Sequence, residues 1–314
     1  MQLYQKPAAL TLNKFQSFLT QFKEDAIPLI IIVLLALCLR FLAMPLIPDN
    51  IGLDNPTYLE AALDIKKDGV ISNQAIMPLY PIVLAIFGAS EKAIILVGML
   101  TGIISVVLVG TLTRAIFGDR KIAFAASTMM AIYPMSIFYS IKGLTESLFL
   151  MLILCAFVAL YKNKLIWSST FFVLSILTRP VMDIFAPFVI FWHALVIRKT
   201  GILYAFRDLT VYGIIYLILM SPWWFHNIEK YDHFVRLNYG FGIVLYSGNN
   251  PMNKSGGGIG RIDYAQADVI QDKYSNRNLS KIDSVFQEAA LKYIREDPSH
   301  FIKMAGVKFM RFWR

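Results

Sequence analysis

The side chain best placed for acid–base chemistry in this chain is the carboxylate of Asp54. It follows the first long apolar run, in the segment Leu53-Asp54-Asn55-Pro56-Thr57-Tyr58. A carboxylate there could accept a proton from a reacting group, and Tyr58 would lie one helical turn further on the same face, where it could hold the carboxylate or a substrate. Structural roles compete with these: Asp54 could cap a helix that starts at Pro56, and Tyr58 could be an interfacial tyrosine.

Cationic side chains at the ends of other apolar runs could stabilise negative charge on a phosphate. Arg179 is the first candidate, although it could instead pair with Asp183, four residues later. Lys142 and His226 are further cationic candidates. Glu146 begins an apolar run, where an acidic first turn suits the helix dipole, or it could contact a substrate as a second carboxylate.

The remaining polar motifs indicate neither a nucleotide loop nor a zinc site. Asn249 and Asn250 lie in a Gly/Pro turn and are either substrate ligands or turn formers. The Gly-rich segment 255–260 is no P-loop, because Lys254 precedes the glycines and no Gly-Lys-Ser/Thr follows. No His/Cys cluster has zinc spacing. We therefore expect no cofactor and no structural zinc, and the sequence leaves a divalent cation open.

The composition predicts an integral membrane protein. The 314 residues are 57% hydrophobic and only 16% charged, against about 25% charged in a soluble domain, and the apolar residues form long runs. The net charge of +9 could suggest nucleic acid. Outside the C-terminal region, however, most basic residues lie in short loops between apolar runs, so we expect no nucleic acid partner. Cys38 and Cys155 lie inside apolar runs and are expected to be core residues.

Seven apolar runs predict seven transmembrane helices, and basic loops predict their orientation. The expected spans are 27–47, 93–113, 122–140, 144–160, 165–179, 181–197 and 209–225. The basic residues that fall on one side of alternating spans are Lys6, Lys14, Lys23, Arg114, Arg120, Lys121, Lys162, Lys164, Arg198, Lys199 and Arg207. That side should be cytoplasmic, together with the N-terminus, and the candidate site residues then face outward. We expect the bacterial inner membrane rather than the endoplasmic reticulum.

The fold class expected is therefore an all-α integral membrane protein with a small mixed outward-facing C-terminal domain. The transmembrane module would be 1–225, with interfacial helices in the first outer loop, 48–92. Within that loop, 78–88 is apolar but too short to cross, which predicts an interfacial or re-entrant segment. The domain 226–314 would contain a helix over 283–296 and end in a membrane-surface segment or the start of a further span.

Several short motifs occur in an order typical of one family. They are Asp54-x-x-x-Tyr58 with Ala61-Ala62 and Gly69, Pro78-x-Tyr80-Pro81, Tyr133-Pro134, Thr145-Glu146-Ser147-Leu148, Thr178-Arg179-Pro180, Ser221-Pro222-Trp223-x-x-His226-Asn227, and Gly248-Asn249-Asn250-Pro251. Each motif is weak alone, but they converge on one predicted membrane face. Over most of its length the chain thus resembles the GT-C superfamily of membrane glycosyltransferases, in the branch of protein O-mannosyltransferases and lipid A aminoarabinose transferases.

The resemblance implies an inverting transfer of a hexose or pentose from a polyprenyl-phosphate donor. The acceptor would be a glycan, lipid or protein on the non-cytoplasmic face, and membrane lipids would be further partners. Asp54 would be the catalytic base. The substrate-binding residues implied are Tyr58, Tyr80, Lys142, Glu146, Arg179, His226, Asn249 and Asn250.

The chain departs from the family pattern at three places. His226 stands where relatives commonly have Arg, and Ile76-Met77 stands where the aminoarabinose branch has a Lys, which argues against aminoarabinose as the sugar. Relatives usually continue with further spans, so we expect a fragment, a short subfamily or an inactive paralogue. Two alternatives remain open: a transporter or flippase for lipid-linked glycans, and an inactive accessory subunit. A transporter needs polar groups at mid-membrane, whereas the span centres here are nearly free of charge.

The predicted orientation places Asn253 and Lys254 on the opposite side of the membrane from Lys162 and Lys199. Cysteines introduced at these positions should therefore react differently with a membrane-impermeant thiol reagent on intact cells: the first two should be labelled and the last two protected. Equal labelling of all four, or protection of position 253 alone, would overturn the topology.

Overall fold

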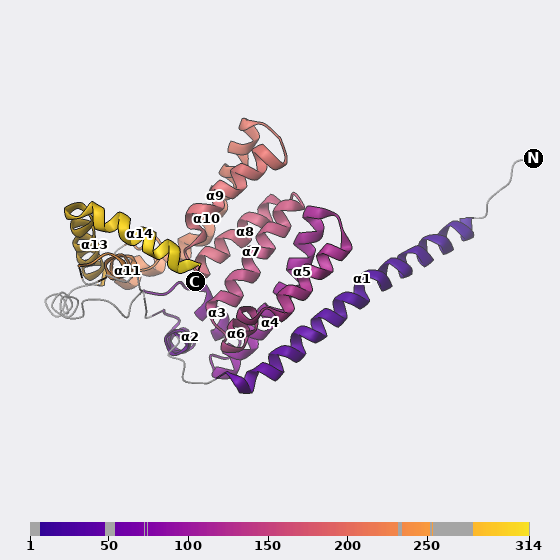
Figure 1. Ribbon diagram of the computed structural model, residues 1–314, viewed down its shortest axis with the longest axis horizontal. Coiled ribbons are helices and arrows are strands. Elements are labelled where there is room, and N and C mark those ends of the chain that lie inside the picture. The colour runs from indigo at the N-terminus through magenta and orange to yellow at the C-terminus, as the bar shows by residue number, and fades with distance from the viewer. Residues whose placement is uncertain are drawn as a thin grey trace, which may run out of the picture. The chain divides into compact units, whose positions relative to one another are not determined.

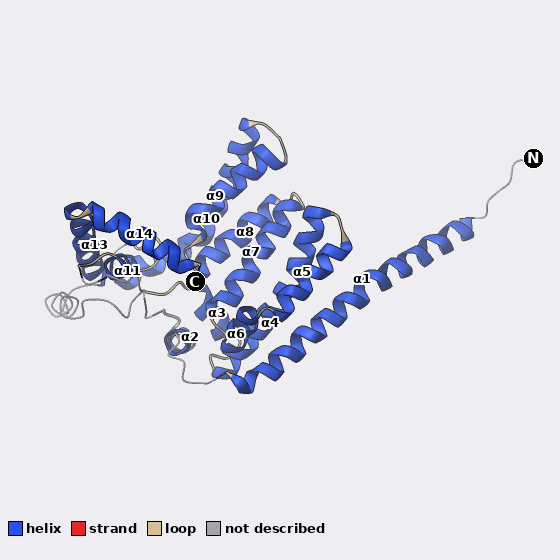
Figure 2. Ribbon diagram, viewed as in Figure 1, coloured by secondary structure: helices blue, strands red, loops and turns tan. Residues whose placement is uncertain are grey.

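The computed structural model of the chain describes residues 7–47, 54–71, 73, 75–231, 234–251, 253 and 279–313. Within these ranges the protein is helical and contains no strand (Figures 1 and 2). The chain divides into two compact units, which we describe separately. One unit is Met1–Ser72 with Met77–Asp232, and the other is Asn73–Ile76 with His233–Arg314. The expected domain boundary after residue 225 falls inside a helix.

The first unit is a helical bundle built around α4. Its elements are α1 (Pro7–Ala43), η1 (Met44–Leu46), α2 (Asn55–Asp68), α3 (Leu79–Ile86), α4 (Glu91–Phe117), α5 (Arg120–Ile132), α6 (Pro134–Lys142), α7 (Thr145–Tyr161), α8 (Leu165–Thr178), α9 (Met182–Trp192), the π-helical turn η2 (His193–Ile197) and α10 (Ile202–Tyr231). Helix α4 packs against α5, α6 and α7, helix α7 packs against α8, and helix α8 packs against α10 (Figure 1).

Each of the seven expected spans contains helix, but not each is long enough to cross a membrane alone. Three helices in the described part have the necessary length and apolar composition: Asp25–Leu46, Glu91–Phe117 and Ile202–Lys230. The pair α5 and α6 would make a fourth. The longest of the others, α7, has 17 residues and extends about 25 Å at 1.5 Å per residue, short of a hydrocarbon core of about 30 Å. Seven crossings therefore stay a prediction.

Two of the expected spans differ in shape or length from the helices that contain them. The span expected over 122–140 is two helices that meet at Tyr133 with a bend of 55°. Tyr133 is extended (φ −66°, ψ 117°), because a residue before proline is disfavoured in the helical region. The helix expected to end at 225 continues to Tyr231. Its last two turns are polar, so hydropathy marked the end of the apolar stretch and not the end of the helix.

The segment 78–88 forms α3, a helix of eight residues that is too short to cross, as expected. It packs against α2. A cluster of buried apolar side chains joins these two short helices to the long ones: Ala62, Tyr80, Leu84, Ala89, Ile94, Val97, Leu148 and Leu152. Helices α2 and α3 are therefore attached to α4 and α7 by these buried side chains.

The described parts of the second unit are helical rather than mixed. They are α11 (Phe241–Gly248), α13 (Leu279–Glu296) and α14 (Pro298–Phe312), and the Gly-rich segment 255–260 lies outside the described residues. The helix expected over 283–296 is present and begins four residues earlier. Asp297 accepts a hydrogen bond from the backbone N–H of His300 (2.9 Å) and so caps α14. Asp297-Pro298 therefore ends one helix and starts the next.

Close approach of α4 to the end of α6 requires a residue without a side chain at Gly98. A Cβ atom there would lie 2.3 Å from the carbonyl oxygen of Ser140 and 2.6 Å from Cα of Gly143. Since both neighbours are backbone atoms, neither could rotate away. The glycine thus sets the distance between α4 and the turn that follows α6.

We predict that Gly98→Ala lowers the stability of the folded protein by about 1–3 kcal/mol through overpacking. Gly213→Ala on α10 is the matched control, because a Cβ there meets no atom within 4 Å and alanine is favoured in a helix by roughly 0.5–1 kcal/mol. Thermal unfolding of the detergent-solubilised protein measures both. Equal unfolding temperatures for the two variants would contradict the packing at Gly98.

Candidate functional site

The turn from Lys142 to Glu146, between α6 and α7, holds the candidate site together. Gly143 adopts a left-handed conformation there (φ 57°, ψ 44°) and ends α6. A Cβ at Gly143 would lie 2.3 Å from the carbonyl oxygen of Ile94 on α4. Both the backbone angle and the available space therefore require glycine at this position.

The carbonyl groups of this turn accept hydrogen bonds from residues of the two short helices α2 and α3. Asn55, at the start of α2, donates from Nδ2 to the carbonyl oxygen of Lys142 at 2.7 Å. The hydroxyl of Tyr80 on α3, which is fully buried, donates to the carbonyl oxygen of Gly143. Asn55 and Tyr80 thus bind two adjacent residues of the turn, which follow them in the sequence by 87 and 63 positions.

The side chains of the same turn hold Arg179. Its Nη1 donates to Oε1 of Glu146 at 2.6 Å and to the hydroxyl oxygen of Thr145 at 2.8 Å. The sequence offered Asp183, four residues away, as an alternative partner, but Asp183 accepts from the hydroxyl of Tyr216 at 2.8 Å. The ion pair of Arg179 is with Glu146, because α8 lies beside α7 and brings the end of α8 to the start of α7.

Tyr58 lies beside this ion pair. Its hydroxyl interacts with the Thr145 side chain, and its ring meets that of Tyr80 edge-on with centroids 5.2 Å apart. Burial raises the pKa of Tyr58 above its ordinary value, partly offset by the Thr145 hydrogen bond, and the charge of Asp54 raises it further. Tyr58 therefore stays protonated at neutral pH and can donate a hydrogen bond. Burial likewise raises the pKa of Tyr80.

Asp54 precedes α2, as expected, but its side chain makes no capping hydrogen bond. Its backbone carbonyl accepts from the N–H of Tyr58 at 3.3 Å, and its side chain is exposed. The carboxylate is thus held at the start of α2 by the backbone while its oxygens remain accessible. The capping role that competed with a chemical role for Asp54 is not seen in the structure.

The other predicted site residues have separate surroundings. Lys142 is buried and contributes its backbone carbonyl to the turn. His226 on α10 lies 3.3 Å from the carbonyl oxygen of Ile71 through Nε2 and stacks on Trp223 at 5.6 Å. These contacts attach the segment after α2 to α10.

Asn249 and Asn250 belong to the second unit and end α11. Asn249 donates from Nδ2 to the carbonyl oxygen of Leu245 (2.9 Å), and Asn250 donates to that of Tyr246 (2.8 Å). Lys308 on α14 donates to the carbonyl oxygen of Gly248 at 2.7 Å. These bonds satisfy carbonyl groups that a helix end leaves unpaired, so the turn-forming role of the two asparagines is the one with structural support.

Sequence reasoning missed three residues that the structure makes prominent: Asn55, Thr145 and Arg40. Arg40 on α1 is fully buried and donates to the carbonyl oxygen of Ala36 and to Oγ of Ser136, both at 3.0 Å. Among the described residues it has no carboxylate partner. A single arginine in a long apolar run was the available signal.

The arrangement defines a polar cluster at one end of a helical bundle. Among the described residues no group of three or more His, Cys, Asp or Glu side chains could hold a metal ion. Comparison of the chain with protein-family models, with curated proteins and with solved structures found no match. The class shown is a helical protein whose described part contains three or four candidate membrane spans. The GT-C resemblance stays a hypothesis that rests on the motifs.

We predict that Tyr80→Phe destabilises the fold by about 1–3 kcal/mol, because the buried carbonyl of Gly143 loses its donor. Tyr133→Phe is the control, since Tyr133 is 54% exposed and a surface change of this kind stays within about 0.5 kcal/mol. The measurement is the thermal unfolding midpoint in detergent. A Tyr80→Phe midpoint equal to that of the control would show that this hydrogen bond does not hold α3 to the turn.

Proposed function

We propose that the protein is a glycosyltransferase that moves a sugar from a polyprenyl-phosphate donor to an acceptor on the non-cytoplasmic membrane face. The observation that carries the proposal is the gathering of Asp54, Tyr58, Tyr80, Glu146 and Arg179 around one turn. The motif resemblance predicted a role for each of these five residues, which come from four separate segments of the chain.

Each group in the cluster has a chemical role in such a transfer. The Asp54 carboxylate takes the proton of an acceptor hydroxyl, and the acceptor oxygen forms a bond to the anomeric carbon. The bond from that carbon to the donor phosphate oxygen breaks, and its electron pair leaves with polyprenyl phosphate. The guanidinium of Arg179 stabilises the negative charge on the leaving phosphate.

Glu146 and Tyr58 act as positioning residues in this scheme. The ion pair of Glu146 with Arg179 is about one-third exposed on each side (33% and 37%), so its contribution to stability is at most roughly 1 kcal/mol. The role of this ion pair is to fix the direction of the Arg179 guanidinium. Tyr58 remains a neutral donor beside Thr145, and it can hold a sugar hydroxyl or the carboxylate.

The placement of buried charge favours this proposal over a transporter. Arg40, Asp183 and Asp208 are buried charged residues of the bundle. Arg40 lies near the end of α1, and Asp183 and Asp208 lie near the starts of α9 and α10. Each is within about two helical turns of a helix end. A path for a charged, phosphate-linked glycan through the bilayer would need charged groups near helix centres.

The direct test is replacement of Asp54 by Asn and by Ala. Both variants should lose about 10²–10⁴ in transfer rate, the usual cost of removing a general base. Because the side chain makes no cap, both should keep stability within about 0.5 kcal/mol of the parent. The assay is release of polyprenyl phosphate from a panel of polyprenyl-phosphate hexoses and pentoses, in membranes that contain the protein.

Glu60→Gln supplies the matched control, because Glu60 is an exposed carboxylate on the same helix, α2. It should transfer at the parent rate. Near-normal transfer by Asp54→Asn would remove Asp54 as the base, and equal losses for Glu60→Gln and Asp54→Asn would attribute the effect to charge near α2 in general.

A further inference from the structure

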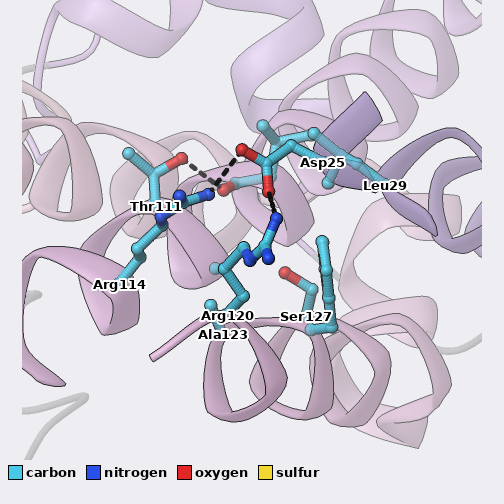
Figure 3. Close-up of a pocket in the computed structure, with 10 residues that line it drawn as sticks. Asp25, Leu29, Thr111, Arg114, Arg120, Ala123 and Ser127 are labelled. Atoms are coloured by element: carbon cyan, nitrogen blue, oxygen red, sulfur yellow. Dashed lines mark hydrogen bonds and ion pairs between the residues drawn. The ribbon is translucent and has the colours of Figure 1, made fainter. Parts of the chain in front are cut away.

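A second polar cluster lies at the other end of α4, away from the candidate site. Asp25 on α1 lies 2.9 Å from Nη1 of Arg114 on α4 and 3.4 Å from Nη1 of Arg120 on α5. Figure 3 shows the carboxylate between the two guanidinium groups, beside Thr111. Three helices that are separate in the sequence thus meet at one carboxylate.

The cluster borders an open cavity of about 100 Å³. Its walls combine the charged groups with apolar side chains, among them Leu29 and Phe124. The ionised side chains of this cavity carry one negative and two positive charges. Both arginine side chains are 41% exposed, so they can reach a ligand from outside the bundle.

The position of the cavity corresponds to a membrane face. Ile94 contacts the turn of the candidate site, and Arg114 lies 20 residues further along α4. That separation is about 30 Å along a helix, equal to the thickness of a hydrocarbon core. Ile27 and Ile30 on α1 and Ile122 on α5 are about half exposed (51%, 55% and 47%), so apolar surface adjoins the cavity on two of its helices.

We propose that this cavity binds the phosphate headgroup of a membrane lipid, with the two arginines on the phosphate and an acyl chain along the apolar surface of α1 and α5. Guanidinium groups suit phosphate oxygens because they present several N–H donors in one plane. The excess positive charge favours an anionic headgroup, and the exposed isoleucines distinguish a lipid from a soluble phosphate. By the predicted orientation the lipid belongs to the cytoplasmic leaflet.

The test measures lipid binding to the whole purified protein by native mass spectrometry, with thermal unfolding in detergent as a second readout. The probes are phosphatidylglycerol, phosphatidylcholine and inorganic phosphate. We expect phosphatidylglycerol to bind and to raise the unfolding temperature more than the other two. Arg114→Gln with Arg120→Gln should weaken that binding by at least about tenfold, and the control Lys121→Gln with Lys162→Gln should not.

The variant Asp25→Asn distinguishes a lipid-binding site from an ion pair that only holds the helices together. The substitution removes the negative charge that competes with the lipid, so affinity for phosphatidylglycerol should rise, and bound lipid should offset any loss of stability. Unchanged or weaker lipid binding in Asp25→Asn would overturn the proposal, as would equal lipid binding by the arginine and lysine double variants. Stabilisation by inorganic phosphate equal to that by phosphatidylglycerol would overturn the lipid assignment.

Discussion

The contact between Gly143 and the backbone of Ile94 is the constraint on which the candidate site depends. It holds the end of α6 against α4 at a distance that no residue with a side chain would permit. The two carbonyl groups at this point are then directed at α2 and α3, where Asn55 and Tyr80 donate to them. Because Thr145 and Glu146, two and three residues after Gly143, hold Arg179, one backbone geometry positions the side chains of the cluster.

The cluster keeps its charges partly accessible. Arg179 and Glu146 are partly exposed to solvent, and the tyrosines beside them are largely buried and protonated. This division suits a site that must meet a charged ligand, because the buried groups fix the geometry while the exposed ones remain available. The Asp54 carboxylate follows the same pattern, since its backbone is bonded into α2 while its side chain is exposed.

Helix α4 relates the two polar clusters of the first unit. One end of α4 contacts the turn at Gly143, and the other end carries Arg114 of the lipid cavity. The residues between them that are buried are small or apolar, such as Gly102, Ser105 and Val106. An apolar helix about as long as the membrane is thick would keep the candidate catalytic site at one membrane face and the lipid-binding cavity at the other.

The sequence by itself predicted the helical class and the approximate positions of the apolar helices. Apolar runs located the long helices, because burial in lipid requires about 20 consecutive apolar residues whatever their neighbours are. Ser90 and Asp119 cap their helices with side-chain hydrogen bonds to residues two or three positions away, and such local signals are visible in any sequence. The residue types at the candidate site were visible as polar and charged groups that border the apolar runs.

Only the tertiary structure decided which of those residues meet. Arg179 pairs with Glu146, 33 positions away, and not with Asp183, the alternative that local spacing offered. The roles of Asn55 and of Thr145 also arise from distant partners. The physical reason is that capping and periodicity act within a few residues of the chain, whereas these contacts depend on which helices pack side by side, and that depends on the shape of every side chain between them.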